Sequence, residues 1–329
     1  MIVPTLARMI VREHLYRPIR GKILTLGRQT VGMTYEQYIE LLHQEGFFPD
    51  DELLEEITIS RDQKTRYGKG SVYISDDVFF NILGIKEFHV MDVSEYEKAD
   101  IMHDLNMVVP DSLIDQFDFI IDGGTFDHLV DIRTAFENIV KMLKPDGRIF
   151  QWNAASNFTG AAYISFGPDL FYDYYVLNQF ADCKVYVAEV DSFGQSELWD
   201  LYEFEGLDQY GYLKSERIQM TVVLAEKGVS STYEKIPVQS QYRDAHLWST
   251  YKKGQELLMS STRKPFVGSG ITLQEKSRSK KRSFIKLIYS RFKEKGLIWI
   301  IGKAIRKCIA HIKQRGKKDI NGFRYLGKI

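Results

Sequence analysis

Short apolar runs recur along the first two-thirds of the chain, and amphipathic stretches separate several of them. Residues 117–121 are apolar at nearly every position, which is typical of a strand buried on both faces of a parallel sheet. Residues 35–43 instead repeat apolar side chains at helical spacing. This alternation predicts an α/β fold with a Rossmann-like, doubly wound and mostly parallel sheet.

The predicted elements follow one another in a simple order. We predict strands at 21–27, 87–91, 99–103, 117–121, 148–152, 184–190 and 218–224. We predict a helix or arm at 1–20 and helices at 35–43, 78–83 and about 129–143, followed by an aromatic-rich helical stretch at 161–175. Thr125 or Asp127 is expected to cap the helix at 129–143. The last two strands are expected to close the sheet as an antiparallel pair.

Aspartates end three of the predicted strands, at Asp92, Asp104 and Asp122. The carboxyl ends of parallel strands meet at one edge of a sheet, where open α/β folds bind ligands. Gly123 and Gly124 follow the last of these acids, and glycine lets the backbone approach a ligand closely. Three acids at one edge are costly unless they meet a ligand or water. The pattern therefore predicts a ligand site at this edge.

Two phrases carry a family resemblance. Residues 122–128 read Asp-Gly-Gly-Thr-Phe-Asp-His, and residues 143–147 read Leu-Lys-Pro-Asp-Gly. They resemble the second half of a class I S-adenosylmethionine-dependent methyltransferase and, more narrowly, methyltransferase-like proteins encoded among bacterial sugar and surface-glycan genes. The resemblance covers about residues 20–245. It implies S-adenosylmethionine as the cofactor and a small molecule, a sugar or glycan precursor, as the methyl acceptor.

The resemblance also implies cofactor contacts. Asp92 would bind both ribose hydroxyls, and it would also cap the turn that follows it. Asp104, with Leu105 beside it, would accept a hydrogen bond from the adenine amino group; the alternative for Asp104 is an ordinary turn. Asp122 and Gly123 would lie beside the sulfonium group.

The first loop departs from the family pattern. The family has an acid at the end of the first strand and a glycine-rich loop after it. Here Thr25 stands in place of the acid, Gly27 keeps the first glycine and Gln29 replaces the second. Arg28 or Gln29 is therefore expected either to bind the methionyl carboxylate or to be an ordinary turn residue.

Candidate catalytic chemistry centres on His128. A hydroxyl acceptor needs a base, and histidine titrates near neutral pH. Asp122 or Asp127 would orient the imidazole, although a lone histidine near a helix start is often structural. Asn157 and Tyr163 are candidates for the acceptor site. The seven histidines are scattered, so we expect no metal site.

The composition offers no pattern of disulfides or membrane segments, and the charge is distributed unevenly along the chain. Of the 329 residues only Cys183 and Cys308 are cysteines, which offers no disulfide framework. The first residues lack the apolar core of a signal peptide, and no run reaches the length of a membrane span. These features predict a cytoplasmic protein. The formal net charge is zero, yet residues 276–318 hold 16 Lys or Arg and one acid, Glu294.

The charge asymmetry suggests how the chain is divided. We predict a methyltransferase-like domain at 1–245 with an insertion at 34–75, a linker at 246–282 and a basic, amphipathic helical tail at 283–318. The tail is expected to bind an anionic membrane surface, at the inner face of the membrane, or to pack on the acidic body or a partner. Nucleic acid is disfavoured because an acidic body would repel it. Homo-oligomerisation remains open.

Two functional interpretations follow. The strand-terminal acids favour a methyltransferase, whereas Thr25 and Gln29 favour a catalytically inactive methyltransferase-like scaffold or binding module. A nicotinamide dehydrogenase is a weaker third interpretation. The first loop lacks the Gly-x-Gly-x-x-Gly pattern of those enzymes, and the expected antiparallel pair argues against their sheet.

Overall fold

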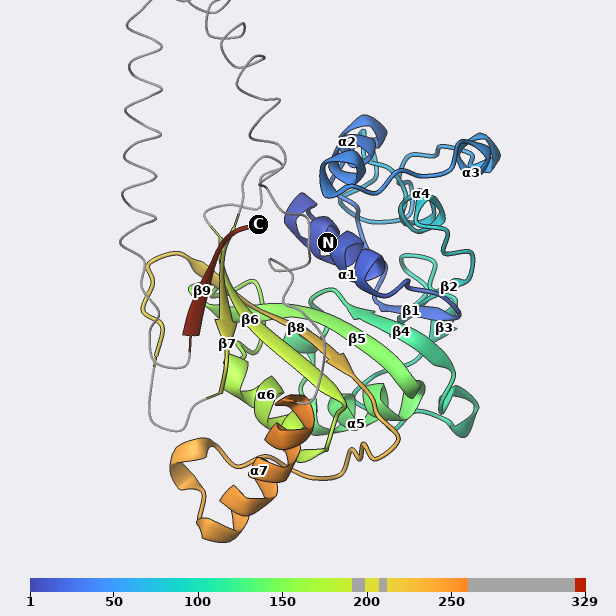
Figure 1. Cartoon of the computed structure of the whole chain (residues 1–329). Helices are drawn as coiled ribbons and strands as arrows, with labels where there is room; N and C mark the ends of the chain where they lie inside the picture. Colours follow the sequence, from blue (N-terminus) through green and yellow to red (C-terminus); the bar gives the residue numbers. More distant parts are fainter. Residues whose placement is uncertain (191–198, 207–211, 260–322) are drawn as a thin grey trace, which may run out of the picture.

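A nine-stranded sheet forms the centre of the molecule, with strand order β3-β2-β1-β4-β5-β8-β6-β7-β9 (Figure 1). The computed structural model describes residues 1–190, 199–206, 212–259 and 323–329. The predicted basic tail at 283–318 therefore lies outside the described residues. Within them the predicted α/β, Rossmann-like architecture is confirmed.

The first five strands run parallel to one another. They are β1 (Ile23–Leu26), β2 (Phe88–Asp92), β3 (Ile101–Met102), β4 (Phe117–Asp122) and β5 (Leu143–Ser156). From β1 the chain winds out to β2 and β3, then returns to β4 on the other side of β1 and continues to β5. The direction of winding thus changes between β1 and β4, and crevices at such switch points are where open α/β sheets bind ligands.

The other end of the sheet is antiparallel. Strand β8 (Ile218–Glu226) lies between β5 and β6 (Asp182–Val190) and runs antiparallel to both. This arrangement confirms the predicted closing pair. Strands β7 (Asp200–Phe204) and β9 (Phe323–Lys328) extend the sheet further, each antiparallel to its neighbour. Neither extension was predicted.

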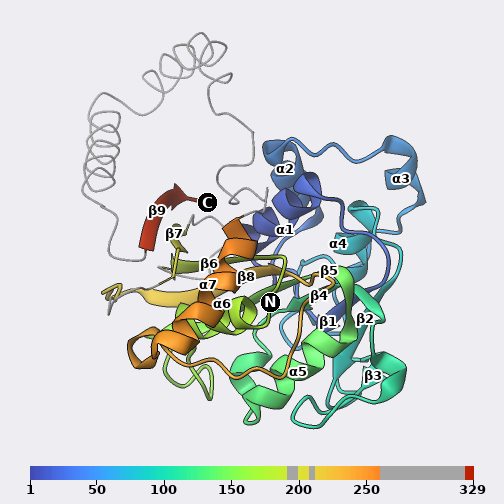
Figure 2. The same cartoon turned by 60° about the horizontal axis from the view of Figure 1, so that its bottom comes forward.

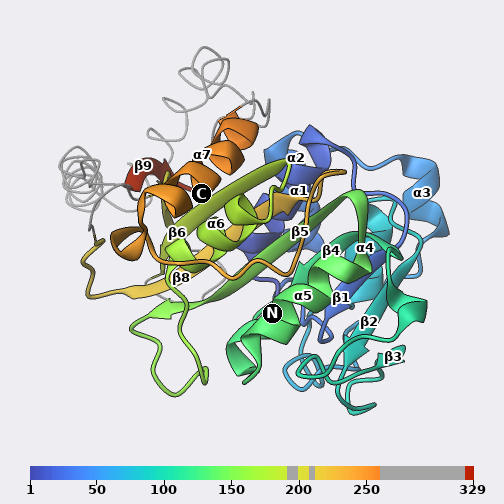
Figure 3. The same ribbon diagram turned by 90° about the horizontal axis from the view of Figure 1, so that it is seen from below.

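Helices cover both faces of the sheet. One face carries α1 (Pro4–Tyr16), α2 (Tyr35–Glu45) and α4 (Asp76–Ile82). The opposite face carries α5 (Ile132–Met142), α6 (Pro168–Leu177) and α7 (Ala245–Met259), as Figures 2 and 3 show. The short α3 (Asp51–Glu56) has no fully buried residue and stands out from the body. The sheet is thus the middle of three layers, with one apolar core on each side.

The start of α5 differs from the expectation. A 3₁₀ turn, η2 (Phe126–His128), follows the β4 turn, and the helix begins only after Asp131. The Oδ1 atom of Asp131 accepts a hydrogen bond from the backbone N–H of Thr134 at 3.0 Å, so Asp131 is the cap. The predicted caps were wrong because their side chains bond elsewhere: Thr125 donates to the Leu26 carbonyl, and Asp127 accepts from the backbone of Ala154.

Two regions contain helices that pack on the body: the predicted insertion at 34–75 and the predicted linker at 246–282. Helix α2, within residues 34–75, begins in a capping box formed by Thr34 and Gln37 and buries Tyr38, Leu41 and Leu42. Helix α7 occupies the first described part of the stretch 246–282 and packs on α6. There Gly254 lies so close to α6 that an added Cβ would be 2.1 Å from the Val176 carbonyl oxygen. Two further 3₁₀ turns are η1 (Asp111–Leu113) and η3 (Ser240–Tyr242).

Candidate functional site

The registers of the central strands bring the expected site residues to one edge. Leu26 of β1 is paired with Met91 of β2 on one side and with Asp122 of β4 on the other. Adjacent strands are about 4.8 Å apart, so the ends of β2 and β4 lie about 10 Å apart, with β1 between them. Gly27, Asp92 and the β4 turn therefore meet at the switch point of the sheet.

Asp122 holds the β4 turn together. Its side chain is fully buried, and its Oδ1 accepts hydrogen bonds from the backbone N–H groups of Thr125 at 2.8 Å and Phe126 at 3.4 Å. Its Oδ2 accepts from the side-chain amides of Gln151 at 3.1 Å and Asn153 at 2.8 Å. Burial raises the pKa of Asp122, and these hydrogen bonds partly offset the rise. With both oxygens occupied, the carboxylate is suited to positioning the turn.

Asp127 and His128 end the β4 turn, with the first side chain buried and the second open to solvent. Asp127 is 4% exposed, and its Oδ2 accepts from the backbone N–H of Ala154 at 3.2 Å. Its Oδ1 accepts no hydrogen bond from the described residues and lies 3.8 Å from the Nε2 of His128. Burial raises the pKa of Asp127. The His128 imidazole is 56% exposed, and its ring centre is 6.3 Å from that of Tyr163.

The first loop is built around a glycine in a left-handed conformation. Gly27 has a φ of 69°, and a Cβ there would come within 3.3 Å of the Thr125 hydroxyl and 3.9 Å of Asp92 Oδ2. A side chain at this position would be strained as well as crowded. Thr25, where the family has an acid, is fully buried and donates to the His89 carbonyl. It therefore faces β2 and is not available to a ligand.

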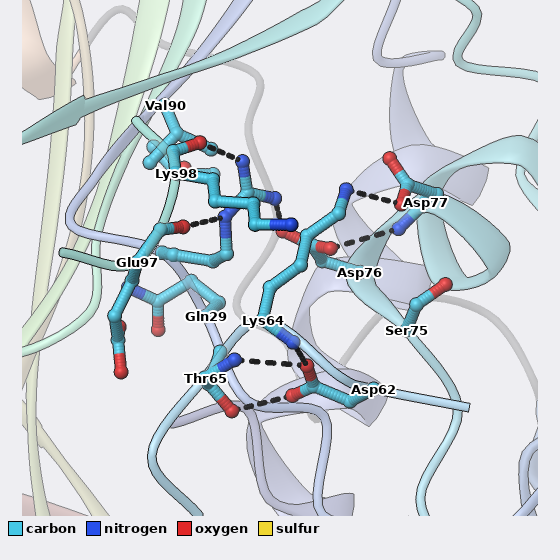
Figure 4. Close-up of polar contacts among 12 residues, drawn as sticks. Gln29, Asp62, Lys64, Thr65, Ser75, Asp76, Asp77, Val90, Glu97 and Lys98 are labelled. Carbon is cyan, nitrogen blue, oxygen red and sulfur yellow. Dashed lines mark hydrogen bonds and ion pairs between the residues drawn. The ribbon is translucent and has the colours of Figure 1, made fainter. Parts of the chain in front are cut away.

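Arg28 is locked inside the protein. Its Nη1 is 2.6 Å from Asp76 Oδ2, and its Nε and Nη2 donate to the backbone carbonyls of Glu97 and Lys98, each at 2.6 Å. Figure 4 shows Glu97 and Lys98 on one side of this contact and Asp76 on the other. The Arg28 side chain is 4% exposed, and each of its three guanidinium nitrogens helps to join the first loop to α4 and to the loop after β2.

The segment between α3 and α4 folds back on this loop. The hydroxyls of Thr30 and Thr65 are 2.7 Å apart, and the Thr65 hydroxyl donates in turn to Asp62, which is buried. In Figure 4, Asp62 and Thr65 lie below Gln29, and the Lys64 side chain extends to Asp77. Sequence reasoning missed this support, because the contact that joins the segment to the first loop, Thr30 to Thr65, spans 35 residues and no local pattern marks it.

Gln29 lies against the β4 turn. It is 3% exposed, and its Nε2 donates to the carbonyls of Leu26 at 3.3 Å and Gly27 at 3.2 Å. Its Oε1 has no partner among the described residues. A Cβ on Gly123 would be only 2.1 Å from that oxygen. The carboxamide therefore fills the space directly over Gly123.

Asp92 and Asp104 are the open acids of the edge. Asp92 Oδ1 accepts a long hydrogen bond from the backbone of Ser94, at 3.4 Å, and Asp104 Oδ1 accepts from the backbone and side chain of Asn106. These bonds from Asn106 lower the pKa of Asp104. The Oδ2 atoms of Asp92 and Asp104 accept no hydrogen bond from the part of the chain that the structure describes. Leu105, beside Asp104, is buried in the core.

These contacts test whether S-adenosylmethionine fits the edge. The two open carboxylate oxygens suit the hydroxyl and amino donors of an adenosine group. Along the sheet the order is β3, β2, β1 and β4. A cofactor with its nucleoside at Asp92 and Asp104 would therefore extend past Gly27, after β1, towards Gly123, after β4. Its amino-acid end would then meet Gln29. The residues fit the nucleoside half, and the half over Gly123 is filled by the protein itself.

A separate cavity of about 270 Å³ lies further along the sheet, beside the end of β5 and the start of α6. Gln219 of β8 lines it, is 6% exposed and has an Nε2 without a partner among the described residues. The remaining lining residues are mostly neutral and include several amides and aromatic rings: Ala155, Ser156, Gly167, Pro168, Asp169, Val187, Phe204, Tyr212, Leu213, Gln239, Ser240, Gln241 and Phe323. No local pattern in the sequence predicts this cavity, since eight separate segments of the chain line it.

The remaining candidates are placed as follows. Asn157 is exposed and donates its amide to the carbonyls of Ser215 and Arg217, so it tethers that loop. Tyr163 is 82% exposed, near His128. Residues 1–190, 199–206, 212–259 and 323–329 contain no group of three side chains suited to a metal ion. The helices in those ranges are too short or too polar to cross a membrane.

Comparisons with known proteins give fold-level similarity. No protein-family model and no curated protein matches the chain. A Thermotoga maritima S-adenosylmethionine-dependent methyltransferase, described as a possible histamine N-methyltransferase, is similar at 16% identity and a TM-score of 0.33, over 45% of this chain and 76% of that one. A Burkholderia thailandensis 1,6-didemethyltoxoflavin N1-methyltransferase is similar at 14% identity and 0.29, over 68% of this chain and 78% of that one.

The same comparison also finds a protein of another activity. A Rhodobacter sphaeroides protein assigned as a zinc-dependent alcohol dehydrogenase is similar at 11% identity and a TM-score of 0.23, over 44% of this chain and 46% of that one. Identities and TM-scores this low do not say what the chain binds or does.

Proposed function

We propose that this chain is an S-adenosylmethionine-dependent methyltransferase that acts on a small molecule. The observation that carries the proposal is the pair Asp92 and Asp104, at the ends of the neighbouring strands β2 and β3. Each has a carboxylate oxygen that accepts no hydrogen bond from the described residues. Such oxygens accept the hydroxyl and amino protons of a nucleoside well. The bound cofactor would supply an activated methyl group, and the protein would align the acceptor and exclude water.

Within this proposal His128 takes the proton from an acceptor hydroxyl. Its exposure lets an acceptor reach it, and Asp127 Oδ1 lies 3.8 Å from its Nε2. Asp127 would stabilise the imidazolium form once the proton has moved. Asp122, which the sequence also offered as the residue that orients His128, would act by holding the turn that carries His128 and Asp127.

The first test is cofactor binding by an Asp92→Asn variant. Asparagine keeps the shape of the side chain but replaces one charged acceptor with a donor. We expect the Kd for S-adenosylhomocysteine, measured by calorimetry, to rise about tenfold or more, because one charge-assisted contact is worth at least ~1.4 kcal/mol. Asp111→Asn, at an exposed acid on η1, is the matched control and should leave the Kd unchanged. Equal affinities for wild type and Asp92→Asn would contradict the assignment.

The acceptor we propose is a neutral, hydroxylated molecule of the sugar or glycan-precursor class. The cavity beside β5 supports this choice. Gln219 offers an Nε2 donor without a partner among the described residues, and Phe204 and Phe323 line the cavity with apolar rings. The amides of Gln239 and Gln241, which bond to Asp169 and to each other, add further polar groups. Amides and hydroxyl groups pair without a charge on either side, and an aromatic face suits the apolar face of a sugar ring.

A Gln219→Leu variant tests this choice. Leucine keeps most of the volume and removes both hydrogen-bonding atoms. In a methylation assay with a panel of monosaccharides and short oligosaccharides, we expect the KM for the best acceptor to rise about tenfold, as for one lost polar contact. The Kd for S-adenosylhomocysteine should not change. Gln116→Leu, at a half-buried glutamine outside the cavity, is the control, and an unchanged KM in Gln219→Leu would exclude the cavity as the acceptor site.

A second candidate function is a methyltransferase-like binding module without catalysis. Two features favour it: all three guanidinium nitrogens of Arg28 bond to the protein, and Gln29 fills the space over Gly123. A folded wild-type protein that binds neither S-adenosylmethionine nor S-adenosylhomocysteine would favour this candidate over the enzyme. The proposed location is the cytoplasm, with residues 283–318 binding the inner face of the membrane; homo-oligomerisation remains a further proposal.

A further inference from the structure

The ligand edge has two unlike halves. On the side of β2 and β3, Asp92 and Asp104 present open carboxylate oxygens. On the side of β4, the carboxamide of Gln29 lies over Gly123, with its oxygen 2.1 Å from where a Cβ of Gly123 would be. Only glycine therefore fits at position 123 unless Gln29 moves.

The Gln29 side chain is weakly held for a buried group. Its two hydrogen bonds, to Leu26 and Gly27, are 3.3 and 3.2 Å long, and the Leu26 carbonyl already accepts a shorter bond of 2.8 Å from the Thr125 hydroxyl. Its Oε1 has no partner in the described residues although the side chain is 3% exposed. A buried oxygen without a donor requires an explanation. Here the side chain loses little hydrogen bonding if it leaves.

We propose that Gln29 is a movable plug that closes the inner half of this edge. With the plug in place, the edge accepts an adenine nucleoside and rejects the amino-acid end of S-adenosylmethionine. The inference rests on the proposed function, since it assumes that the nucleoside lies on Asp92 and Asp104. If the plug is out in only a tenth of the molecules, the apparent affinity for the whole cofactor falls tenfold, while the affinity for adenosine is unchanged.

The test compares adenosine with S-adenosylhomocysteine by calorimetry, using wild type, Gln29→Gly and Gln29→Met. In wild type we expect the two Kd values to agree within about threefold. In Gln29→Gly the Kd for S-adenosylhomocysteine should fall about tenfold or more, and that for adenosine should stay within threefold. Gln29→Met keeps the volume of the plug without its polar atoms, so its Kd ratio should match wild type. Gln29→Ala is a second variant with a small side chain and should behave as Gln29→Gly does. Thermal melting of each protein verifies that it is folded.

The outcomes separate this inference from the proposed function. If wild type binds S-adenosylhomocysteine at least ten times more tightly than adenosine, the plug is overturned and the nucleoside site stands. The same holds if the ratio of the Kd for S-adenosylhomocysteine to the Kd for adenosine is equal in Gln29→Gly and Gln29→Met. If none of the folded proteins binds either ligand, the proposed cofactor site is overturned, and the plug with it. A lower ratio in Gln29→Met similar to that in Gln29→Gly would assign the effect to polarity and would also overturn the plug.

Discussion

Replacing Arg28 with methionine should lower the free energy of unfolding by about 3–5 kcal/mol, as expected when one partner of a buried ion pair is removed. The change would leave Asp76 buried without its guanidinium and would unpair the carbonyls of Glu97 and Lys98. Methionine retains similar bulk, so the loss would reflect charge and hydrogen bonding more than a cavity. Chemical denaturation at pH 8, followed by circular dichroism, measures the effect.

The loss should also depend on pH, through Asp76. Burial raises the pKa of Asp76 to about 6, against the opposing pull of Arg28. Because the folded-state pKa is above the ordinary value of 3.8, the folded protein holds this proton more tightly, and stability falls as pH rises from about 4 to about 6. Without Arg28 the pKa should rise further, so the difference between wild type and variant should be smaller at pH 5 than at pH 8.

Two comparisons complete the Arg28 experiment. Arg133→Met removes an arginine that is 64% exposed and pairs with Glu137 on the surface of α5, and it should change stability by no more than about 0.5 kcal/mol. Asp76→Asn should flatten the pH dependence between pH 4 and 6, since it removes the titrating group. A loss in Arg28→Met as small as that in Arg133→Met would show that the buried pair does not hold the first loop.

Replacing Asp122 with alanine should destabilise the protein by about 3–5 kcal/mol, because it leaves four donors without an acceptor at a fully buried position. Two of the donors are backbone N–H groups of the β4 turn, and two are side-chain amides of β5. The turn that carries Asp127 and His128 would then lose its main support. Equilibrium unfolding in urea gives the magnitude.

The matched comparison is Asp92→Ala, at the end of the neighbouring β2. Asp92 accepts one long hydrogen bond and is partly exposed, so its removal should change stability by no more than about 0.5 kcal/mol while weakening S-adenosylhomocysteine binding. The two aspartates occupy equivalent places in the sequence pattern, yet one would act on the fold and the other on the ligand. If Asp122→Ala were as stable as Asp92→Ala, the assignment of Asp122 as the support of the turn would be refuted.

The sequence predicted the strands of the ligand edge well because the signal there is local. Each of β2 and β4 is a short apolar run that ends in an aspartate, and both ends lie at the switch point as expected. It was less successful at the start of α5, where Thr125, Asp127 and Asp131 all have capping side chains. Only the packed structure decides between them, because the first two find partners on β1 and β5.

Contacts between distant segments account for what the sequence did not predict. Arg28 meets Asp76 and the carbonyls of Glu97 and Lys98, which are 48 to 70 residues away, and no periodicity reports such a pairing. The strand β9 pairs with β7 across 119 to 128 residues. In the same way, the burial of Gln29 follows from the approach of Gly123, and the spacing of glycines in the first loop could not reveal it.

The pairing of β9 with β7 changes how the stretch 260–322 is attached. Helix α7 precedes that stretch and packs on α6, and β9 follows it and joins the sheet. The segments directly before and directly after residues 260–322 therefore belong to the same folded body. A deletion that probes residues 260–322 must be internal, with a short linker rejoining 259 to 323. Simple truncation after 259 would also strip β9 from β7 and leave that strand as an unprotected edge, which promotes aggregation.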